Sequence, residues 1–400
     1  MNTGISPGVL RILVILLAIL IFILIALRFS SVETPIPTKI PPPLDGTPIV
    51  TPTSFPDIVS NQHAYPNVRL AWFYKPPDDA LLPTLAKNFD IIILTHKDEA
   101  QRDALKSLGV KSPIFLYLQL LEIKDPGSCS DTPQGNQVAY QAGDFCKISE
   151  QHPDWFLLDQ NGNRIVNNNS VYMDPGNAEY RAFWLQRARA LQEQYHWDGF
   201  FLDNLEASLS KISSTGIVTA KYPDDESYQV AIEGFLKYLR QNYFEPRRQP
   251  VLANIISIKD WKVWLRYLQY LDGAMIEAFA VDWSTDYLSP SAWESELDAI
   301  DKALLQGKNL ILVSQAEQPD PDRQQFALAS YLLIANRNAF FRYADSGGYR
   351  KVLLYENYSL NLGEPLGPRY KKGSSWQRDF ANGYVLVNPR THRAEIKLNP

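Results

Sequence analysis

Cysteine and histidine are scarce in this chain of 400 residues, which has two cysteines and five histidines. The histidines show neither His-x-His nor His-Glu-x-x-His spacing, so the sequence does not indicate a metal site. The chain also lacks a Gly-x-Gly-x-x-Gly after its first predicted strand, a Gly-x-x-x-x-Gly-Lys-[Ser/Thr] loop and a Gly-x-Ser-x-Gly elbow. We therefore expect no nucleotide cofactor, no other cofactor, no metal and no serine nucleophile.

An excess of positive charge is also missing. Lys and Arg number 39 against 44 Asp and Glu, which gives a net charge of −5. Such a protein has no basic field to concentrate a polyanion, so nucleic acid is not an expected partner. With 45% hydrophobic residues, the chain can bury a large core.

A hydrophobic run lies near the N-terminus. Residues 12–27 are sixteen consecutive apolar residues, and their neighbours extend the run close to the ~20 that span a bilayer. The sequence predicts an uncleaved transmembrane signal anchor at 9–29 after a short tail at 1–8, with the following domain exported. A cleavable signal peptide is the alternative, although the flank at 27–31 lacks a small-x-small cleavage site.

A proline-rich segment follows, with eight prolines at 35–56. Such chain favours an extended conformation, so we predict a linker at 30–64. The remaining sequence divides into a barrel domain at 65–345 and a short β-rich extension at 346–400, packed on the barrel. The predicted location is therefore membrane-anchored, with the catalytic domain outside the cytoplasm.

Strand-like and helix-like segments alternate after the linker, which indicates βαβ units and a parallel sheet. The predicted strands are 68–74, 90–95, 113–119, 199–204, 251–255, 273–278 and 309–315, with 340–343 as a poor eighth. The predicted helices are 79–88, 97–108, 178–195, 226–242, 260–271, 291–306 and 323–339. This pattern favours an α/β fold, a (β/α)8 TIM barrel.

Two predicted strands carry the same pattern of Asp-Gly, three apolar residues and a carboxylate, which ends in Asp203 and in Glu277. By count these are strands four and six, and equal offsets on alternate strands place both carboxylates at one height of the barrel mouth. Two facing carboxylates are the minimum equipment for cleaving a glycosidic bond. We predict Asp203 and Glu277 as the catalytic pair.

A carboxylate at a strand end can also cap a helix or pair with a buried arginine, so each residue alone is a weak indication. Glu206, just past strand four, is the alternative acid. Asp198 and Asp272 precede their strands and are interpreted as turn residues before glycine.

Several segments together resemble TIM-barrel glycoside hydrolases of poorly assigned specificity, distantly related to the endo-α-1,4-polygalactosaminidase and α-galactosidase-like barrels. They are WDGFFLDN at 197–204, IEAF at 276–279, FFRYA at 340–344, LGEPLG at 362–367 and WQRDFANGYVLVNP at 376–389. In the α-galactosidase-like barrels the strand-four aspartate is the nucleophile and a strand-six carboxylate is the acid/base. The resemblance therefore implies these roles for Asp203 and Glu277, although the relatives have Asp at the second position.

Other strand ends supply polar and aromatic side chains that suit a neutral or amino sugar, because rings cover sugar C–H surfaces and amides bind hydroxyls. The predicted substrate-binding residues are Trp72, Tyr74, Tyr117, Gln119, Asn204, Glu206, Asn254, Asp282, Trp283, Gln315, Arg342 and Tyr343. Single aromatics of this kind are core residues more often than ligands.

The two cysteines, Cys129 and Cys146, lie in the insertion after strand three. In an exported protein we expect them to form a disulfide. The C-terminal extension has two alternating runs, at 383–388 and 394–398, which predict strands, and its tail could wall the site.

Two functions from different classes remain at this point. The first is a membrane-tethered, extracytoplasmic glycoside hydrolase that cleaves a polysaccharide by a two-carboxylate retaining mechanism. The second is a catalytically inactive barrel that binds sugar at the surface or takes part in polysaccharide assembly. The matched carboxylates favour the first. The sequence leaves the oligomeric state open.

Overall fold

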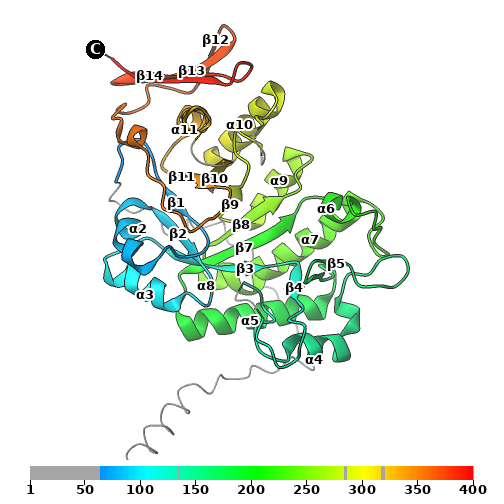
Figure 1. Ribbon diagram of the computed structural model, residues 1–400. Helices are drawn as coiled ribbons and strands as arrows, with labels where there is room; N and C mark the ends of the chain where they lie inside the picture. The colour runs from blue at the N-terminus through cyan, green and yellow to red at the C-terminus, as the bar shows by residue number, and fades with distance from the viewer. Residues whose placement is uncertain (1–63, 134–135, 283–285, 317–319, 400) are drawn as a thin grey trace, which may run out of the picture. The chain divides into compact units, whose positions relative to one another are not determined.

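The computed structural model describes residues 64–133, 136–282, 286–316 and 320–399, which form a parallel barrel with additions (Figure 1). The predicted anchor at 9–29 and the proline-rich linker up to residue 63 lie outside these residues. Within them, no helix combines the length and the apolar character needed to cross a membrane.

Eight parallel strands form the barrel wall, hydrogen-bonded in chain order. The wall closes where Phe341 N–H donates to the carbonyl of Arg69 at 2.7 Å, beside a bridge between Leu70 and Phe341. This arrangement confirms the predicted (β/α)8 barrel. The strands are β1 (Ala71–Trp72), β2 (Ile91–Leu94), β3 (Ile114–Gln119), β7 (Gly199–Glu206), β8 (Val251–Ile256), β9 (Gly273–Ile276), β10 (Asn309–Ala316) and β11 (Ala339–Asp345).

Helices between the strands cover the barrel, and five of them begin with side-chain caps that the sequence supplies. The Asn177 side chain accepts the N–H groups of residues 179 and 180, and Asp224, Asp260, Ser289 and Asp320 cap four later helices. The helices are α2 (Leu82–Asn88), α3 (Glu99–Ser107), α4 (Asp144–Gln151), α5 (Ala178–Tyr195), α6 (Ser210–Ser213), α7 (Asp225–Leu239), α8 (Glu245–Arg247), α9 (Trp261–Tyr267), α10 (Pro290–Leu305) and α11 (Pro321–Ile334). Short 3₁₀ or π turns are η1 (Asp79–Leu81), η2 (Pro153–Trp155), η3 (Arg240–Phe244), η4 (Leu268–Tyr270) and η5 (Glu356–Ser359).

The helix predicted at 323–339 is too long. The observed α11 ends at Ile334, because the Asn336 side chain accepts the N–H of Asn338 at 2.8 Å and forms a turn that feeds β11. As a result, β11 runs over seven residues and is a full eighth strand.

The insertion after β3 contains a small antiparallel sheet of β4 (Glu122–Lys124), β6 (Ser170–Tyr172) and β5 (Val166–Asn167). Within this insertion, the Cys129–Cys146 disulfide links the loop after β4 to α4. The predicted pairing is therefore confirmed.

A four-stranded antiparallel sheet ends the chain, formed by β12 (Tyr370–Lys372), β13 (Ser375–Phe380), β14 (Gly383–Asn388) and β15 (Arg393–Leu398). The two alternating runs correspond to β14 and β15, whereas β12 and β13 were not predicted. Arg378 donates to the carbonyls at the end of α11, and Arg369 pairs with Asp298 and Asp301 on α10. These contacts attach the sheet to the barrel.

The first described residues are held by the C-terminal extension. The Asn67 side chain donates to the carbonyl of Gly363 and accepts the N–H of Leu362, both at 2.8 Å. The chain therefore enters β1 across a pair of hydrogen bonds to a segment almost 300 residues away.

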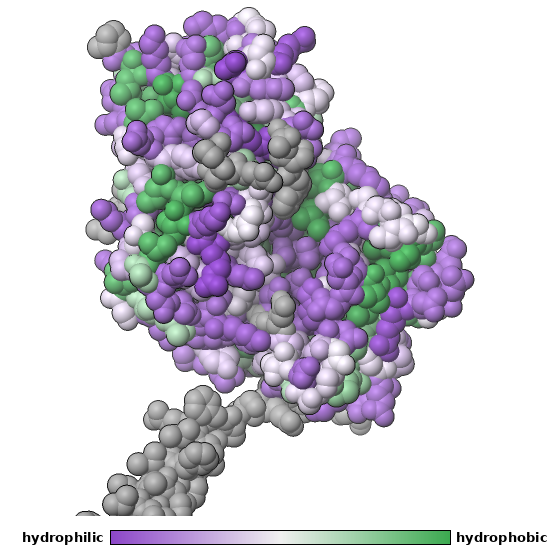
Figure 2. Space-filling model, viewed as in Figure 1, coloured by the Kyte–Doolittle hydropathy of each residue, from purple (hydrophilic) through white to green (hydrophobic). Residues whose placement is uncertain are grey.

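Most large apolar residues lie inside this structure. Figure 2 shows a mainly hydrophilic face on which apolar residues gather in separate small patches. Inward-pointing residues at period two fill the barrel, including Phe201, Leu252 and Met275. The next inward position on each of these strands is polar, and it faces the mouth.

The repeated Asp-Gly pairs have a structural role at the other end of the barrel. Asp272 accepts the N–H of Val251 at 2.9 Å and pairs with Arg240, and Asp198 accepts the N–H of Ile114 at 2.8 Å. These aspartates tie the starts of neighbouring strands together, so they are more than turn residues. The glycines that follow them have no room for a side chain.

We predict that Gly273→Ala destabilises the protein by at least about 2 kcal/mol. A Cβ at this position would lie 1.9 Å from the backbone oxygen of Asn309 on β10. Urea unfolding measures the loss. Gly367→Ala is the control, because a Cβ there meets nothing within 4 Å. Equal stability of the two variants would contradict this explanation of the Asp-Gly pattern.

Candidate active site

The two predicted carboxylates meet at the carboxyl ends of the barrel strands. Asp203 lies on β7, two residues beyond the inward-pointing Phe201, and Glu277 directly follows β9, two residues beyond Met275. The same period of two therefore turns both acids toward the barrel axis. Asp203 is 7% exposed.

Asn254, on the strand between them, bridges the two acids. Its side-chain nitrogen donates to Asp203 Oδ1 at 3.0 Å and to Glu277 Oε2 at 2.8 Å. Because both oxygens bind one nitrogen, these two oxygens lie at most about 6 Å apart, so both carboxyl groups face the same small space. Asn254 itself is 2% exposed and is held on β8.

The second oxygen of each acid accepts a tyrosine hydroxyl. Tyr117, on β3, donates to Asp203 Oδ2, and Tyr349, from the loop after β11, donates to Glu277 Oε1 at 2.8 Å. Burial raises the pKa of both tyrosines well above the usual value, so both hydroxyls keep their protons. Each carboxylate is thus fixed by two donors.

Both acids have raised pKa values. Burial and the adjacent Asp203 charge raise the pKa of Glu277 to about 7, although the bonds from Tyr349 and Asn254 act in the opposite direction. Burial also raises the pKa of Asp203, and the bonds from Tyr117 and Asn254 oppose it. Glu277 can therefore hold a proton near neutral pH.

Asp203 lies in a dry environment. It is buried, and its charge is stabilised by the Tyr117 and Asn254 donors. Asn204 adopts a φ of 54° at a bulge between β7 and β8. The bulge interrupts the period of two directly after Asp203.

Glu206 lies beyond this bulge and is completely buried. Its Oε1 accepts Tyr172 at 3.1 Å and lies 3.7 Å from Lys211 Nζ, which also pairs with Glu122 at 3.0 Å. Burial raises the pKa of Glu206 to about 7. Asn254 bridges Asp203 to Glu277 and makes no such bond to Glu206, so Glu277 is the partner that the geometry supplies.

Two cavities flank the acids. One of about 510 Å³ is lined by the loops after β8 and β9 and by α10, and it includes Asn254 and Glu277. The other, of about 340 Å³, begins at Tyr74, whose ring stacks on Tyr117 with 4.8 Å between centroids. An elongated ligand could therefore extend to both sides of the carboxylate pair.

The structure brings together some of the predicted substrate-binding residues. Tyr74, Tyr117 and Asn254 lie at the acids. The Gln315 amide donates to the Glu277 carbonyl at 3.3 Å, and Gln119 is buried at the end of β3 with an unpartnered Oε1. Asp282 is exposed after β9, and Trp283 lies outside the described residues.

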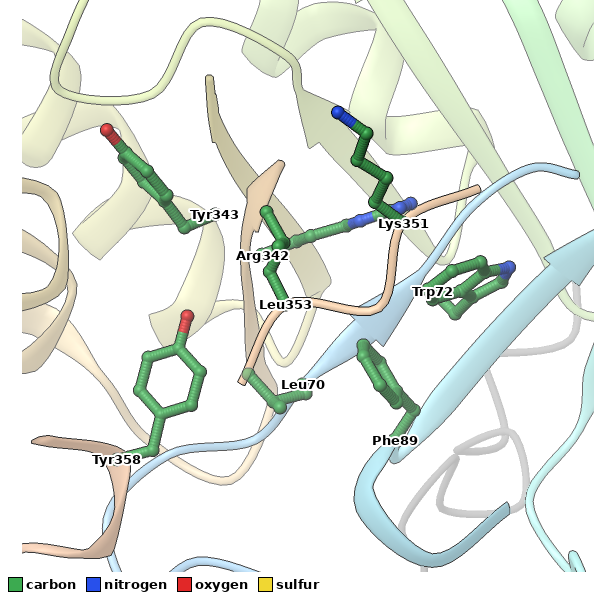
Figure 3. A pocket seen from close by; sticks show the side chains of 8 residues that line it. All are labelled: Leu70, Trp72, Phe89, Arg342, Tyr343, Lys351, Leu353 and Tyr358. Atoms are coloured by element: carbon green, nitrogen blue, oxygen red, sulfur yellow. The ribbon is translucent and has the colours of Figure 1, made fainter. Parts of the chain in front are cut away.

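Other predicted contacts are core residues. Trp72 is fully buried, with its ring 4.3 Å from the Arg342 guanidinium and edge-on to Phe89. Figure 3 shows Arg342 extending toward Trp72 in a pocket of only about 10 Å³, too small for a sugar. Tyr343 is also buried, and its hydroxyl donates to the Asp320 carbonyl at 3.4 Å.

Arg342 acts on the site indirectly. Its guanidinium donates to the carbonyls of Phe73 and Tyr349, and so it holds the loop that presents Tyr349 to Glu277. Sequence analysis missed Tyr349 because it assigned residue 349 to the C-terminal extension. The position of Tyr349 shortly after the eighth strand was the sequence feature that could have indicated a place at the site.

Among the described residues, no group of three or more His, Cys, Asp or Glu side chains could hold a metal ion. The site therefore consists of two acids at the mouth of a parallel barrel, each fixed by neutral donors. This arrangement is that of a barrel glycoside hydrolase.

Comparison with known families gives the same class. The family described as hypothetical glycosyl hydrolase family 15 matches residues 114–384, more than half of the chain. The chain belongs to this family and is a glycoside hydrolase. No curated protein matches it.

Solved structures with similar folds include the glycoside hydrolase domain of PelA from Pseudomonas aeruginosa, at 19% identity and a TM-score of 0.48, over 72% of this chain and 97% of that one. The maltogenic α-amylase AmyB from Thermotoga neapolitana is 14% identical with a TM-score of 0.48, over 80% and 86% of the two chains. An α-galactosidase from Geobacillus stearothermophilus is 10% identical with a TM-score of 0.45, over 80% of this chain and 47% of that one.

We predict that Tyr349→Phe raises the pKa of Glu277 further, by about one pH unit. The hydroxyl of Tyr349 stabilises the charged form of Glu277, so its removal favours the protonated form. Carbon-13 NMR titration of the Glu277 carboxyl measures this change without any substrate. Tyr384→Phe is the control, because its hydroxyl bonds the distant Glu395. An unchanged or lowered pKa in Tyr349→Phe would contradict the assigned contact.

Proposed function

We propose that this glycoside hydrolase cleaves a polysaccharide by a retaining mechanism in which Asp203 is the nucleophile and Glu277 is the acid/base. The observation that carries the proposal is the Asn254 bridge, which limits the distance between the facing oxygens of the two acids to at most about 6 Å. That spacing leaves little room for a water between acid and sugar, so direct attack by Asp203 is favoured.

In the first step, Asp203 attacks the anomeric carbon and forms a covalent ester. The bond from that carbon to the leaving oxygen breaks, and this oxygen takes the proton of Glu277. In the second step, Glu277 accepts a proton from water, and the water oxygen attacks the anomeric carbon. The sugar leaves with its original configuration, Asp203 is released as a carboxylate, and Glu277 is protonated again.

The pKa values support this division of roles. Glu277 must be protonated at the start, and its pKa is raised to about 7. Activity should therefore fall as the pH rises through about 7, where Glu277 loses its proton. It should also fall at low pH, where Asp203 becomes protonated.

We predict that Asp203→Asn abolishes turnover of every substrate, because no covalent intermediate can form. Glu277→Gln should lower hydrolysis of natural linkages by roughly 10²–10⁴-fold, spare aryl glycosides with good leaving groups, and be rescued by azide. Reducing-end release from a panel of polysaccharides and hydrolysis of aryl glycosides measure these effects.

Glu206→Gln is the matched control for Glu277→Gln, since it makes the same exchange in a buried acid on β7, the strand of Asp203. It should retain activity. If Glu206→Gln is inactive while Glu277→Gln is not, the acid/base has been misassigned. NMR of the first-formed anomer should show retention, and inversion would make Asp203 a general base.

We further propose that residues 9–29 anchor the protein in a membrane with the barrel outside the cytoplasm. The uninterrupted apolar run supports the anchor, and the disulfide is consistent with an oxidising compartment. A polysaccharide of the cell surface or envelope is then the accessible substrate.

The anchor predicts that the full-length protein stays in the membrane fraction after an alkaline carbonate wash, with its N-terminal segment intact by mass spectrometry. Replacing Leu16 and Leu20 by Arg should release it, since charge at the centre of a span is costly. A mature protein that begins near Ser31 would instead identify a cleaved signal peptide.

A further inference from the structure

The cavity of about 340 Å³ carries an unusual set of charges. It is formed by the loops after β1, β2, β3 and β11, at the mouth of the barrel. Three cationic residues, Lys75, Lys97 and Arg350, line it together with one acid, Asp98. The cavity therefore carries an excess of positive charge, although the chain as a whole has a net charge of −5.

None of the three cations has a carboxylate within ion-pair distance among the described residues. Lys75 lies over the Tyr74 ring at 5.6 Å, Lys97 donates to the carbonyl of Pro133, and Arg350 donates to that of Pro76. These contacts orient the side chains and leave their charges uncompensated. All three residues are exposed to solvent.

The single acid is already engaged. Asp98 Oδ2 accepts both the N–H of Thr95 at 2.9 Å and its hydroxyl at 2.6 Å, which fixes the turn before α3. The Asp98 carboxylate is therefore bonded to Thr95 and not to any of the three cations, and the cavity keeps a net positive charge.

The cavity adjoins the reacting groups. The Tyr74 ring stacks on Tyr117, which donates to Asp203, and lies 5.9 Å from the ring of Tyr349, which donates to Glu277. Lys75 and Arg350 each follow one of these tyrosines in the chain. A sugar chain that crosses the acids toward Tyr74 would next meet the cations.

The cavity on the other side of the acids lacks this charge. Its only lysine, Lys259, is paired with Asp225 at 2.8 Å, and it also contains Glu277 and the buried Glu296. The two ends of the site therefore differ in sign, and only the Tyr74 side suits an anion.

We propose that this cationic cavity binds a carboxylate-bearing sugar of the substrate, so that the enzyme acts on an acidic, uronic-acid-containing polysaccharide. The inference rests on the proposed function, and it replaces the neutral or amino sugar that the sequence suggested for this part of the site. Tyr74 supports the sugar ring, and Lys75, Lys97 and Arg350 bind the carboxylate by charge-assisted hydrogen bonds.

Calorimetric binding to the full-length protein in detergent tests this assignment. The protein carries Asp203→Asn, so that the probe is not hydrolysed. The probes are oligosaccharides of galacturonate, mannuronate and glucuronate, with methyl-esterified oligogalacturonate as the neutral counterpart and inorganic phosphate as a free anion. At least one acidic series should bind, more weakly at high salt, and its neutral or reduced counterpart should bind at least about tenfold more weakly.

Replacing Lys75, Lys97 and Arg350 together by Gln should weaken binding of the acidic probe by at least about tenfold. Lys75→Gln alone breaks no hydrogen bond seen in the structure and should weaken binding of the acidic probe by a smaller factor. This single variant keeps the test valid if the triple variant does not fold. Lys237→Gln, at an exposed position on α7, should bind as before.

The proposal is overturned if no acidic oligosaccharide binds, if neutral and acidic probes bind equally, or if the lysine and arginine variants match the Lys237→Gln control. Binding of phosphate alone would assign the cavity to a free anion and also overturn it. None of these results affects the hydrolase assignment, which depends on reducing-end release by the unsubstituted protein and its loss in Asp203→Asn.

Discussion

The hydrogen bonds of one amide nitrogen, on Asn254, determine the chemistry available to the rest of the site. Two carboxylates held within about 6 Å in a buried space repel each other, and without compensation one would turn away or remain protonated at all relevant pH. The Asn254 nitrogen donates to both acids at once and is itself fixed on β8 between their strands. Burial, together with the repulsion that remains, raises the pKa of Glu277 and so contributes to its proposed role as the acid.

The barrel explains why these three residues can meet. Parallel strands in chain order present their carboxyl ends on one face, and inward positions recur every second residue. Asp203, Asn254 and Glu277 each follow a large inward residue by two positions, on three adjacent strands. The packed apolar interior of the barrel therefore lies directly beneath these three polar side chains.

The same periodicity sets the limit of what the sequence predicts. It placed Asp203 and Glu277 on one face and helped to recover the barrel strands, whereas the disulfide was predicted from the expected export of the protein. Trp72 and Tyr74 are two residues apart, so strict alternation places both on the same face of a strand. The sequence could not show that they differ, because β1 ends at Trp72 and the chain after it no longer alternates. Trp72 alternates with the inward Ala71 and Phe73 and packs outward on Phe89, whereas Tyr74 reaches the site.

The other features that the sequence did not predict lie in loops and at a bulge, because the residues there follow no regular spacing. Tyr349 reaches Glu277 from the loop after β11, and the bulge at Asn204 directs Glu206 into a separate buried cluster with Tyr172 and Lys211. Both features depend on backbone conformation and on contacts between distant segments, which composition and spacing do not encode.

The contact between Asn67 and residues 362–363 would have a mechanical consequence if the proposed anchor holds the protein at a membrane. A pull on the chain before the barrel domain would first load two hydrogen bonds between the start of that domain and the C-terminal extension. Asn67 lies four residues before β1. The load would therefore pass to the C-terminal extension before it reached the strand that leads to Tyr74, and the residues at the mouth of the barrel would keep their positions.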